Sequence, residues 1–345
     1  MSVNVGIVGA TGYAGVELIR ILLNHPQAKL AAISSVSFEG QPIAQVYPSL
    51  GEICPLVCGT AEQVIVASDV VFAALPHGLS ETLARQCVDA GKKLIDLGAD
   101  FRLESEDDYQ EWYQLPYKDK EMHKHAVYGL CELFRDEIPG HAIVANPGCY
   151  PTSAALGLAP AIRDGMIETG HIIIDSKSGV TGAGRGLSLG NHFPECNEAF
   201  SPYKVAAHRH TPEIEQTLSK LAGKDVKITF VPHLLPVNRG IVSTMYAPLK
   251  EGWTTESVQG AYQRFYEKER FVRILNVGQT ANLKHVKCSN YCDISVHVDA
   301  RTSTLVIVSA IDNMVKGAAG QAVQNLNILC GFAEDTALGM IPPAF

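Results

Sequence analysis

One cysteine in this sequence is placed to act as a covalent nucleophile. Cys149 follows the apolar run Ala142–Ala145 and the turn Asn146-Pro147-Gly148, and it precedes a segment with helical spacing of apolar residues. A thiolate at a helix N-terminus is stabilised by the helix dipole and by backbone N–H groups, which lowers its pKa. A lone cysteine is more often a small buried apolar residue. Its predicted place at the edge of a parallel sheet, where ligands bind, favours the nucleophile.

Two histidines are candidates for the general acid and base. His208 and His210 flank Arg209, just before a predicted helix that has Thr211 as its cap and Pro212 at its first position. Near-neutral imidazole suits proton transfer. The spacing does not choose between the two histidines, and the alternative role for either is to cap or pack the helix.

A glycine-rich turn near the N-terminus predicts a dinucleotide site. It lies between the apolar run Val3–Val8 and the helical segment Val16–Leu23. In this context glycines tighten the turn, let a pyrophosphate approach the backbone and let the helix pack on the strand. The alternative is a tight turn without a ligand. The residues assigned to cofactor binding here are Gly9, Thr11, Gly12, Tyr13, Ala14 and Gly15.

The end of the second predicted strand favours NADP(H) over NAD(H). After Leu30–Ile33 the chain continues with Ser34 and Ser35. An NAD-preferring site usually has an acidic residue at this position, which holds the ribose 2′-hydroxyl. Serines can bond a 2′-phosphate and do not repel it.

Alternation of apolar strands and helices predicts how these residues are positioned. Strands are expected at Val64–Val66, Asp69–Leu75 and Lys93–Leu97, and residues 104–125 are expected to form a surface excursion. The pattern indicates an α/β fold, a Rossmann-type domain with a parallel sheet covered on both faces. After the cysteine, runs that alternate apolar and polar residues indicate a second, α+β domain with a mixed or antiparallel sheet. We expect residues 1–148 plus 315–345 to form the NADP-binding domain and 149–314 the catalytic and oligomerisation domain.

Composition excludes several classes of protein. The 345 residues suggest two domains, and the net charge of −8 without a basic run argues against nucleic-acid binding. We expect no membrane span and no signal peptide, and therefore a cytoplasmic protein. The nine cysteines include two pairs at i, i+4 spacing, but no matching second pair accompanies either, so no metal site is indicated.

Six motifs together resemble one family. They occur in order along essentially the full length of the chain, and NPGCYPT and HRHTPEI are specific in combination. They are GATGYAG, DLGADFRL, NPGCYPT, SGVTGAGR, HRHTPEI and DNMVKGAAGQAVQN. The sequence resembles the N-acetyl-gamma-glutamyl-phosphate reductases, which are related to aspartate-semialdehyde dehydrogenases. Gly98 departs from the family pattern, in which a serine is expected.

The resemblance implies a role for each matching residue. Cys149 matches the nucleophile that forms a thioacyl enzyme from an acyl phosphate, and His210 matches the acid/base, with His208 beside it. Arg102 matches an arginine that grips the substrate phosphate, the alternative being a surface ion pair. Substrate contacts are thereby assigned to Arg102, Asn146 and Arg209. The nicotinamide side of the cofactor is assigned to the loop that holds Ser178, Gly179 and Gly182. A further cofactor contact late in the chain is assigned to Asn313, Lys316 and Gly317.

Two alternatives to this function stay open at the level of sequence. The family implies a small acyl-phosphate substrate and a homo-oligomer, a dimer or a tetramer. A sibling enzyme acting on aspartyl phosphate or on carrier-bound aminoadipyl phosphate would share the cofactor and the cysteine. A regulator that binds NADP without turnover would be expected to have lost its nucleophile or base, and here Cys149, His210 and Arg102 are all present.

Overall fold

The computed structural model describes residues 2–345, and contacts divide them into two units. The first unit is Met1–Pro147 with Ala318–Gly339, and the second is Gly148–Gly317 with Met340–Phe345. The sequence prediction assigned 315–345 as a whole to the first domain. No helix within residues 2–345 is long and apolar enough to cross a membrane.

The first unit is built on a parallel sheet of seven strands, in the order β3-β2-β1-β4-β5-β7-β6. Every neighbouring pair in it is parallel. Its strands are β1 (Val3–Val8), β2 (Ala28–Ser34), β3 (Cys58–Gly59), β4 (Val70–Ala73), β5 (Lys93–Asp96), β6 (Ala126–Tyr128) and β7 (Ile143–Ala145). Strand order reverses at β1, where β2 and β4 lie on opposite sides, so the carboxyl end of β1 is the switch point at which such sheets bind ligands.

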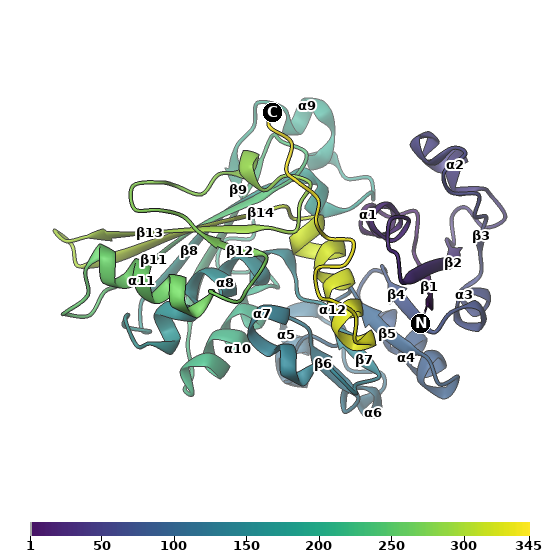
Figure 1. Cartoon of the computed structure of the whole chain (residues 1–345), viewed down its shortest axis with the longest axis horizontal. Helices are drawn as coiled ribbons and strands as arrows, with labels where there is room; N and C mark the ends of the chain where they lie inside the picture. Colours follow the sequence, from purple (N-terminus) through teal and green to yellow (C-terminus); the bar gives the residue numbers. More distant parts are fainter. Residues whose placement is uncertain (1) are drawn as a thin grey trace. The chain divides into compact units, whose positions relative to one another are not determined.

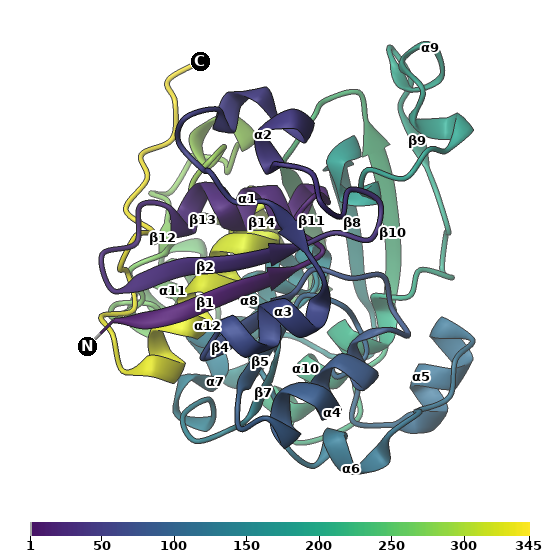
Figure 2. The same cartoon turned by 90° about the vertical axis from the view of Figure 1, so that its right-hand side faces the viewer.

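Helices cover both faces of this sheet, as the sequence predicted. The helices are α1 (Tyr13–Leu22), α2 (Ile43–Val46), α3 (Ala61–Ala67), α4 (Ser80–Asp89), α5 (Glu106–Tyr113), α6 (Lys120–His123), α7 (Cys131–Phe134) and α12 (Gly320–Cys330). Helix α1 contacts α12, and α3 contacts α4. Figure 2 shows β1 and β2 with α1 on one side and α3 on the other. The buried face of α1 includes Leu18 and Ile19, at 0% exposure, and packs on the apolar residues of β1 such as Val5 and Ile7.

The segment Val64–Val66, predicted as a strand, belongs to helix α3. A capping box begins this helix: Gln63 N–H donates to Thr60 Oγ1 (3.3 Å), and Thr60 N–H donates to Gln63 Oε1 (3.0 Å). Val64 is fully buried whereas Val66 is 81% exposed. The prediction was wrong because three apolar residues in a row fit a short strand as well as one turn of a helix.

The excursion at residues 104–125 has a small core of its own. Helix α5 begins at Glu106, and its Tyr109 is fully buried. The Tyr109 hydroxyl donates to Asp100 Oδ1 (2.8 Å), and its ring stacks on Tyr113 with centroids 5.0 Å apart. Aromatic side chains therefore anchor this segment to the end of β5.

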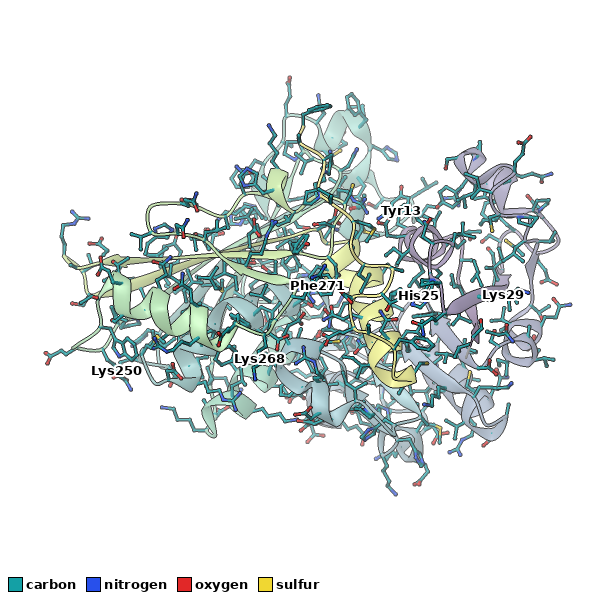
Figure 3. All side chains as sticks on the ribbon, in the orientation of Figure 1. Tyr13, His25, Lys29, Lys250, Lys268 and Phe271 are labelled. Carbon is teal, nitrogen blue, oxygen red and sulfur yellow. The ribbon has the colours of Figure 1, made fainter. Side chains whose placement is uncertain are left out.

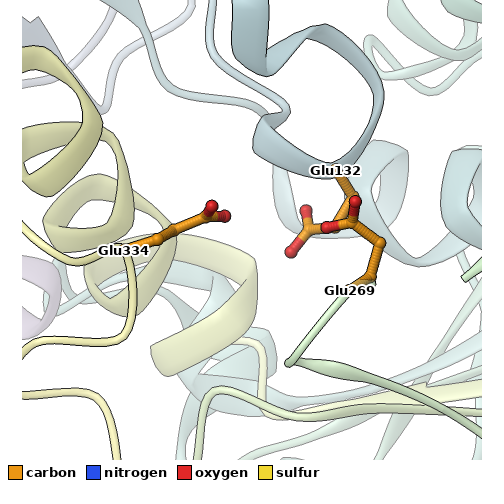
Figure 4. Close-up of side chains that lie close together, drawn as sticks. All are labelled: Glu132, Glu269 and Glu334. Carbon is orange, nitrogen blue, oxygen red and sulfur yellow. The ribbon is translucent and has the colours of Figure 1, made fainter. Parts of the chain in front are cut away.

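Polar contacts attach α12 to the first unit. His25, labelled in Figure 3, accepts N–H bonds from Gln27 and Ala28 at Nδ1, so Nε2 carries the proton and donates to Asn327 Oδ1 (2.8 Å). Gln324 Nε2 donates to Glu132 (2.9 Å) and to Glu334 (2.7 Å), two of the three glutamates labelled in Figure 4. These amides of α12 give hydrogen-bond partners to His25, Glu132 and Glu334, and thereby hold the helix on the first unit.

The second unit contains a mixed sheet of seven strands, in the order β12-β13-β14-β11-β8-β10-β9, which confirms the predicted fold class. Pairs β8–β10 and β12–β13 are parallel and the others are antiparallel. Its strands are β8 (Ile172–Gly179), β9 (Ser201–Pro202), β10 (Ile228–Leu235), β11 (Ile241–Pro248), β12 (Val272–Ile274), β13 (Cys292–Asp299) and β14 (Thr304–Ile311). Its helices are α8 (Cys149–Arg163), α9 (Phe193–Cys196), α10 (Thr211–Ala222) and α11 (Thr255–Phe265).

Helix α8 lies against one face of the second sheet (Figure 1). Close packing fixes it there, since a Cβ at Gly157 would lie 2.3 Å from Met245 Cε. Buried hydroxyl groups also join helix to sheet: Ser153 Oγ donates to Ser243 Oγ (2.9 Å), which bonds Ser176 Oγ (2.7 Å). The helix that begins at Cys149 is thus held to the sheet by both shape and hydrogen bonds.

Candidate active site

The glycine turn of the first unit follows β1 and begins α1. Gly9 has φ +89°, and a Cβ there would lie 2.4 Å from the Ala74 carbonyl oxygen. A Cβ at Gly15 would lie 2.4 Å from the Gly9 carbonyl oxygen. Both glycines are therefore required by the protein's own backbone.

Gly12, unlike Gly9 and Gly15, is not required to be a glycine by contacts with the protein's own backbone. It precedes α1 as the N-cap with φ −73°, which any residue adopts, and the nearest atom to an added Cβ is 3.5 Å away. The first turn of α1 has no acidic residue and no side-chain cap. The N-terminus of α1 therefore presents backbone N–H groups beside a residue without a side chain, which fits a pyrophosphate.

The serines after β2 shape this turn. Ser34 O accepts the N–H groups of Gly9 (3.1 Å) and Ala10 (2.9 Å). Ser35 Oγ bonds Thr11 Oγ1 (2.7 Å), and both serines are buried. Tyr47, which the sequence reasoning missed because it lies 36 residues away, donates its hydroxyl to Thr11 O (2.9 Å). No carboxylate occupies the end of β2, so a 2′-phosphate would meet no charge of its own sign there.

Arg102 is buried, with 7% of its surface exposed. Its Nε donates to the Asn146 carbonyl oxygen (2.8 Å) and its Nη2 to that of Leu97 (2.7 Å). The Asn146 side chain is also buried: Nδ2 donates to Ala318 O (3.1 Å), and Oδ1 accepts from Asn325 (3.0 Å). Both residues therefore hold the end of β7 in place, and their predicted substrate contacts stay predictions.

A buried carboxyl group at the end of β5 was not noticed in the sequence. Asp96 is fully buried, and its Oδ1 accepts from Ser80 Oγ (2.7 Å) and Gly98 N–H (2.9 Å). Burial, reinforced by the nearby Asp100, raises the pKa of Asp96 to about 7. A Cβ at Gly98 would lie 3.0 Å from Asp96 Oδ1, so the glycine that departs from the family pattern leaves room for this carboxyl.

Cys149 is the first residue of α8, in the second unit. The preceding residue is held by both of its backbone polar groups: Gly148 N–H donates to Glu213 Oε1 (2.8 Å), and Gly148 O accepts from Thr152 N–H and Oγ1 (2.9 Å each). Pro151 has no N–H, so the donors of the first turn are the N–H groups of Cys149 and Tyr150. This arrangement places the thiol at the positive end of a helix that runs for 15 residues.

Gly317 lies directly against Cys149. A Cβ at Gly317 would be 2.7 Å from Cys149 Cβ and 3.2 Å from its Cα. Gly317 belongs to a π-helical turn, Val315–Ala319, in which its N–H donates to Asp312 O (2.9 Å). The neighbouring Lys316 is fully buried, with Nζ 5.7 Å from the centre of the ring of Phe271, which is labelled in Figure 3. Both were predicted as cofactor contacts, and the structure places Gly317 against Cys149 and Lys316 in the interior.

The two histidines have different surroundings. His210 is half-buried and precedes α10 as its N-cap, the position predicted for Thr211, which is instead the first helical residue. His208 is 6% exposed, and its Nδ1 accepts His210 N–H (3.1 Å). Burial lowers the pKa of His208 to about 3, so it stays neutral at neutral pH. These surroundings favour His210 over His208 as the acid/base.

Two tyrosines complete this region and were missed from the sequence. Tyr150 meets the rings of His208 and His210 edge-on, with centroids 5.4 and 5.8 Å away, and its hydroxyl bonds that of Tyr203 (3.0 Å). Burial raises the pKa of Tyr203 to about 12, so it stays a neutral donor. Tyr150 follows the cysteine directly and could have been found from the NPGCYPT motif, whereas Tyr203 had no sequence signal.

The predicted nicotinamide-side loop begins at the end of β8. Asn313 braces it: Oδ1 accepts Gly240 N–H (2.6 Å), and Nδ2 donates to Thr181 Oγ1 (3.2 Å). Ser178 is buried, and a Cβ at Gly179 would lie 2.7 Å from Arg239 N. Gly182 has only ordinary contacts, the nearest being Ser178 Oγ at 3.5 Å. Packing against the backbone of Arg239 therefore explains why residue 179 is a glycine, but no close contact explains the glycine at 182.

Comparison with known proteins agrees with this architecture. Residues 4–141 match a family described as semialdehyde dehydrogenase, NAD binding domain, and residues 149–313 match semialdehyde dehydrogenase, dimerisation domain. The solved structure of aspartate semialdehyde dehydrogenase II from Vibrio cholerae shares the fold, with a TM-score of 0.75 at 16% identity, covering 96% of this chain and 99% of that one. An aspartate semialdehyde dehydrogenase from Candida albicans, solved with NADP, has a TM-score of 0.72 at 16% identity over 97% of this chain and all of that one.

Much closer sequence relatives exist among bacterial proteins. An N-acetyl-gamma-glutamyl-phosphate reductase of Clostridium beijerinckii is 53% identical, covering 99% of this chain and 100% of the relative. One of Brachyspira hyodysenteriae is 54% identical with the same coverage of both chains. The resemblance inferred from the six motifs is confirmed, and the chain belongs to the N-acetyl-gamma-glutamyl-phosphate reductase family.

Proposed function

We propose that this enzyme uses NADPH to reduce N-acetyl-gamma-glutamyl phosphate to N-acetylglutamate 5-semialdehyde and phosphate, a step of arginine biosynthesis. The observation that carries the proposal is the position of Cys149 at the first residue of α8, in the unit that also holds His210 at the start of α10. Two relatives that bear this name are 53% and 54% identical over 99% of this chain and all of their own length.

The first step is acyl transfer to the enzyme. The Cys149 thiolate attacks the carbonyl carbon of the acyl phosphate, a C–S bond forms, and the C–O bond to phosphate breaks. The dipole of α8 stabilises the thiolate before attack, and the first-turn N–H groups stabilise the oxyanion of the tetrahedral intermediate. We assign the leaving phosphate to Arg102, whose planar guanidinium is oriented by two backbone carbonyl groups. Asn146 and Arg209 are further proposed substrate contacts.

The second step reduces the thioester. A nicotinamide cofactor held by the glycine turn and by the loop from Ser178 would supply the hydride for the carbonyl carbon. His210 protonates the resulting oxyanion, and then takes the hydroxyl proton back as the C–S bond breaks and the aldehyde leaves. His208 assists by accepting the backbone N–H of His210, which fixes the start of α10. The thiolate is regenerated, so atoms and charge balance over the cycle.

The glycine turn of the first unit and its serines bind the cofactor. The proposed contacts run from Gly9 to Gly15 and continue to Ser34 and Ser35, which leave room for a 2′-phosphate without opposing it. In the second unit, the loop from Ser178 and its brace Asn313 are proposed to hold the nicotinamide side. Lys316 is fully buried, so it contributes through the turn that it anchors.

Location and assembly follow from the same chemistry. A catalytic thiol and a reduced cofactor both need a reducing compartment, which supports a cytoplasmic enzyme. The family model that covers residues 149–313 is described as a dimerisation domain, and this supports a homo-oligomer. We propose a dimer or a tetramer of this chain.

The test is the reverse reaction, followed as NADPH absorbance at 340 nm. Purified protein receives NADP, phosphate or arsenate, and either N-acetylglutamate semialdehyde or aspartate semialdehyde. Phosphate-dependent NADPH formation with the acetylated substrate alone is the expected result. Activity with aspartate semialdehyde instead would transfer the proposal to the sibling enzyme.

A variant of the nucleophile separates an enzyme from a cofactor-binding regulator. Cys149→Ala should lower kcat by at least about 10⁴-fold while the Kd of NADPH, measured by fluorescence, stays within about twofold. Activity of the variant within tenfold of the unchanged protein would remove Cys149 from the mechanism. Inactivity of both proteins with intact NADPH binding would favour the regulator.

A further inference from the structure

Glu213 is a buried carboxylate that the mechanism above does not use. It lies in the first turn of α10, three residues after His210, and its side chain is fully buried. Burying a carboxylate is costly unless hydrogen bonds compensate for the lost water. Its Oε1 accepts the N–H of Gly148 at 2.8 Å, across 65 residues of sequence.

This contact joins the turn of the nucleophile to the helix of the base. Gly148 is the N-cap of α8 and directly precedes Cys149, while Glu213 shares its helical turn with the residues that follow His210. The next peptide group, Gly148–Cys149, is held by Thr152, whose N–H and hydroxyl both donate to Gly148 O at 2.9 Å. The two peptide groups on either side of Gly148 are thus fixed from two helices.

The distance between nucleophile and base depends on how α8 and α10 are joined. Acyl transfer and proton transfer both need reacting atoms within a few tenths of an ångström of their required positions. A short N–H bond to a fully buried acceptor oxygen fixes the distance between the two segments that it joins, so it suits a positioning role. The main alternative is that Glu213 only stabilises the fold.

We propose that Glu213 is a positioning residue of the reductase reaction, which fixes the Gly148 peptide and thereby sets Cys149 relative to His210. The inference rests on the proposed function and adds a residue to it. If the inference is right, the reaction depends on the length of the side chain at position 213, which brings an acceptor oxygen to Gly148 N–H, and not on its charge.

Three substitutions separate reach from charge. Glu213→Gln keeps an acceptor oxygen at the same distance, so kcat should stay within about threefold. Glu213→Asp keeps the charge but shortens the side chain by one methylene, so kcat should fall by roughly 10- to 100-fold, as for Glu213→Ala, with KM for the acyl substrate within about twofold. Rescue by glutamine and failure of aspartate is the pattern that a purely electrostatic role would not give.

Glu215 offers a matched control on the same helix. Its carboxylate accepts Ile228 N–H (3.0 Å) and pairs with Lys227 (3.1 Å), away from Gly148. Glu215→Ala should lower the melting temperature and leave kcat unchanged when activity is measured well below that temperature. If Glu213→Ala and Glu215→Ala lose stability alike and both keep kcat, Glu213 is structural and the inference fails.

A readout independent of turnover completes the test. The rate of Cys149 alkylation by iodoacetamide, located by peptide mass, should match the unchanged protein in Glu213→Gln and differ at least about threefold in Glu213→Asp and Glu213→Ala. Equal alkylation and equal kcat in all three variants would overturn the inference. An unchanged protein without reductase activity would instead overturn the proposed function, and the alkylation comparison would still decide whether Glu213 positions Cys149.

Discussion

The glycine turn of the first unit and the cysteine turn of the second differ in how much of their construction is local. The glycine turn has two requirements within its own seven positions, since Gly9 takes a positive φ and Gly15 leaves room for the Gly9 carbonyl group, and Ser34, Ser35 and Tyr47 add hydrogen bonds from outside the turn. The cysteine turn is held by residues far along the chain, since Glu213 bonds Gly148 and Gly317 packs on Cys149. The sequence therefore predicts the glycine turn from its own residues, whereas at the cysteine turn it predicts Cys149 but not the distant residues that hold it.

The largest expected effect tests the base of the second unit. His210→Asn should lower kcat by roughly 10²- to 10⁴-fold, because the oxyanion loses the group that donates a proton to it. His208→Asn is the matched variant: asparagine Oδ1 can replace Nδ1 as the acceptor of His210 N–H, so kcat should fall less than about tenfold. Steady-state kinetics with NADPH and the acyl phosphate measures both. A larger loss in His208→Asn than in His210→Asn would exchange the two roles.

Stability against pH should differ between the units because one buries an acid and the other a base. The pKa of Asp96 is raised from 3.8 to about 7, mainly by burial and then by Asp100, with Arg102 opposing. Between about pH 4 and 7 the folded protein keeps a proton that the unfolded chain has released, so this contribution to stability falls as pH rises. The loss should be roughly 2–4 kcal/mol, and Asp96→Asn should abolish it in denaturant unfolding at pH 5 and 8.

The buried base of the second unit has the opposite sign. Burial lowers the pKa of His208 from 6.5 to about 3, so the unfolded chain binds the proton first and stability falls as pH drops below about 6.5. His208→Asn should therefore flatten the acid side of the stability curve, and Asp96→Asn the neutral side. Equal pH dependence in both variants would contradict the assignment of these groups.

The sequence predicted what depends on neighbours in the chain. The strand–turn–helix around Gly9–Gly15, the helix after Cys149 and the mixed second sheet all follow from local periodicity. The prediction of a strand at residues 64–66 was wrong because the capping box of Thr60 and Gln63 favours a helix, and this outweighed the β-branched composition of the segment. Tyr203 could not be found, since its contact with Tyr150 spans 53 residues and depends on how β9 meets β10.

Gly317 sharpens the comparison because it was assigned from the sequence to cofactor binding. A Cβ there must displace Cys149, whose Cβ would be 2.7 Å away. Gly317→Ala should lower kcat by roughly 10- to 100-fold and leave KM for NADPH within about twofold. Gly170→Ala is the control, since no atom lies within 4 Å of an added Cβ and its kcat should not change. A raised KM for NADPH with unchanged kcat would restore the cofactor contact.

The smallest expected effect is that of Gly12→Ala, which is the counterpart in the first unit of Gly317→Ala in the second. Its φ of −73° suits alanine, and the nearest protein atom to an added Cβ is 3.5 Å away, so Gly12→Ala should fold with a melting temperature close to that of the unchanged protein. The methyl group then points to where the pyrophosphate binds, and KM for NADPH should rise about tenfold with kcat at saturation nearly unchanged. Gly9→Ala, with φ +89° and a clash with Ala74 O, should instead lose stability. If Gly12→Ala left KM for NADPH unaltered, the glycine turn would be explained by folding alone, and the contrast with the cysteine turn would disappear.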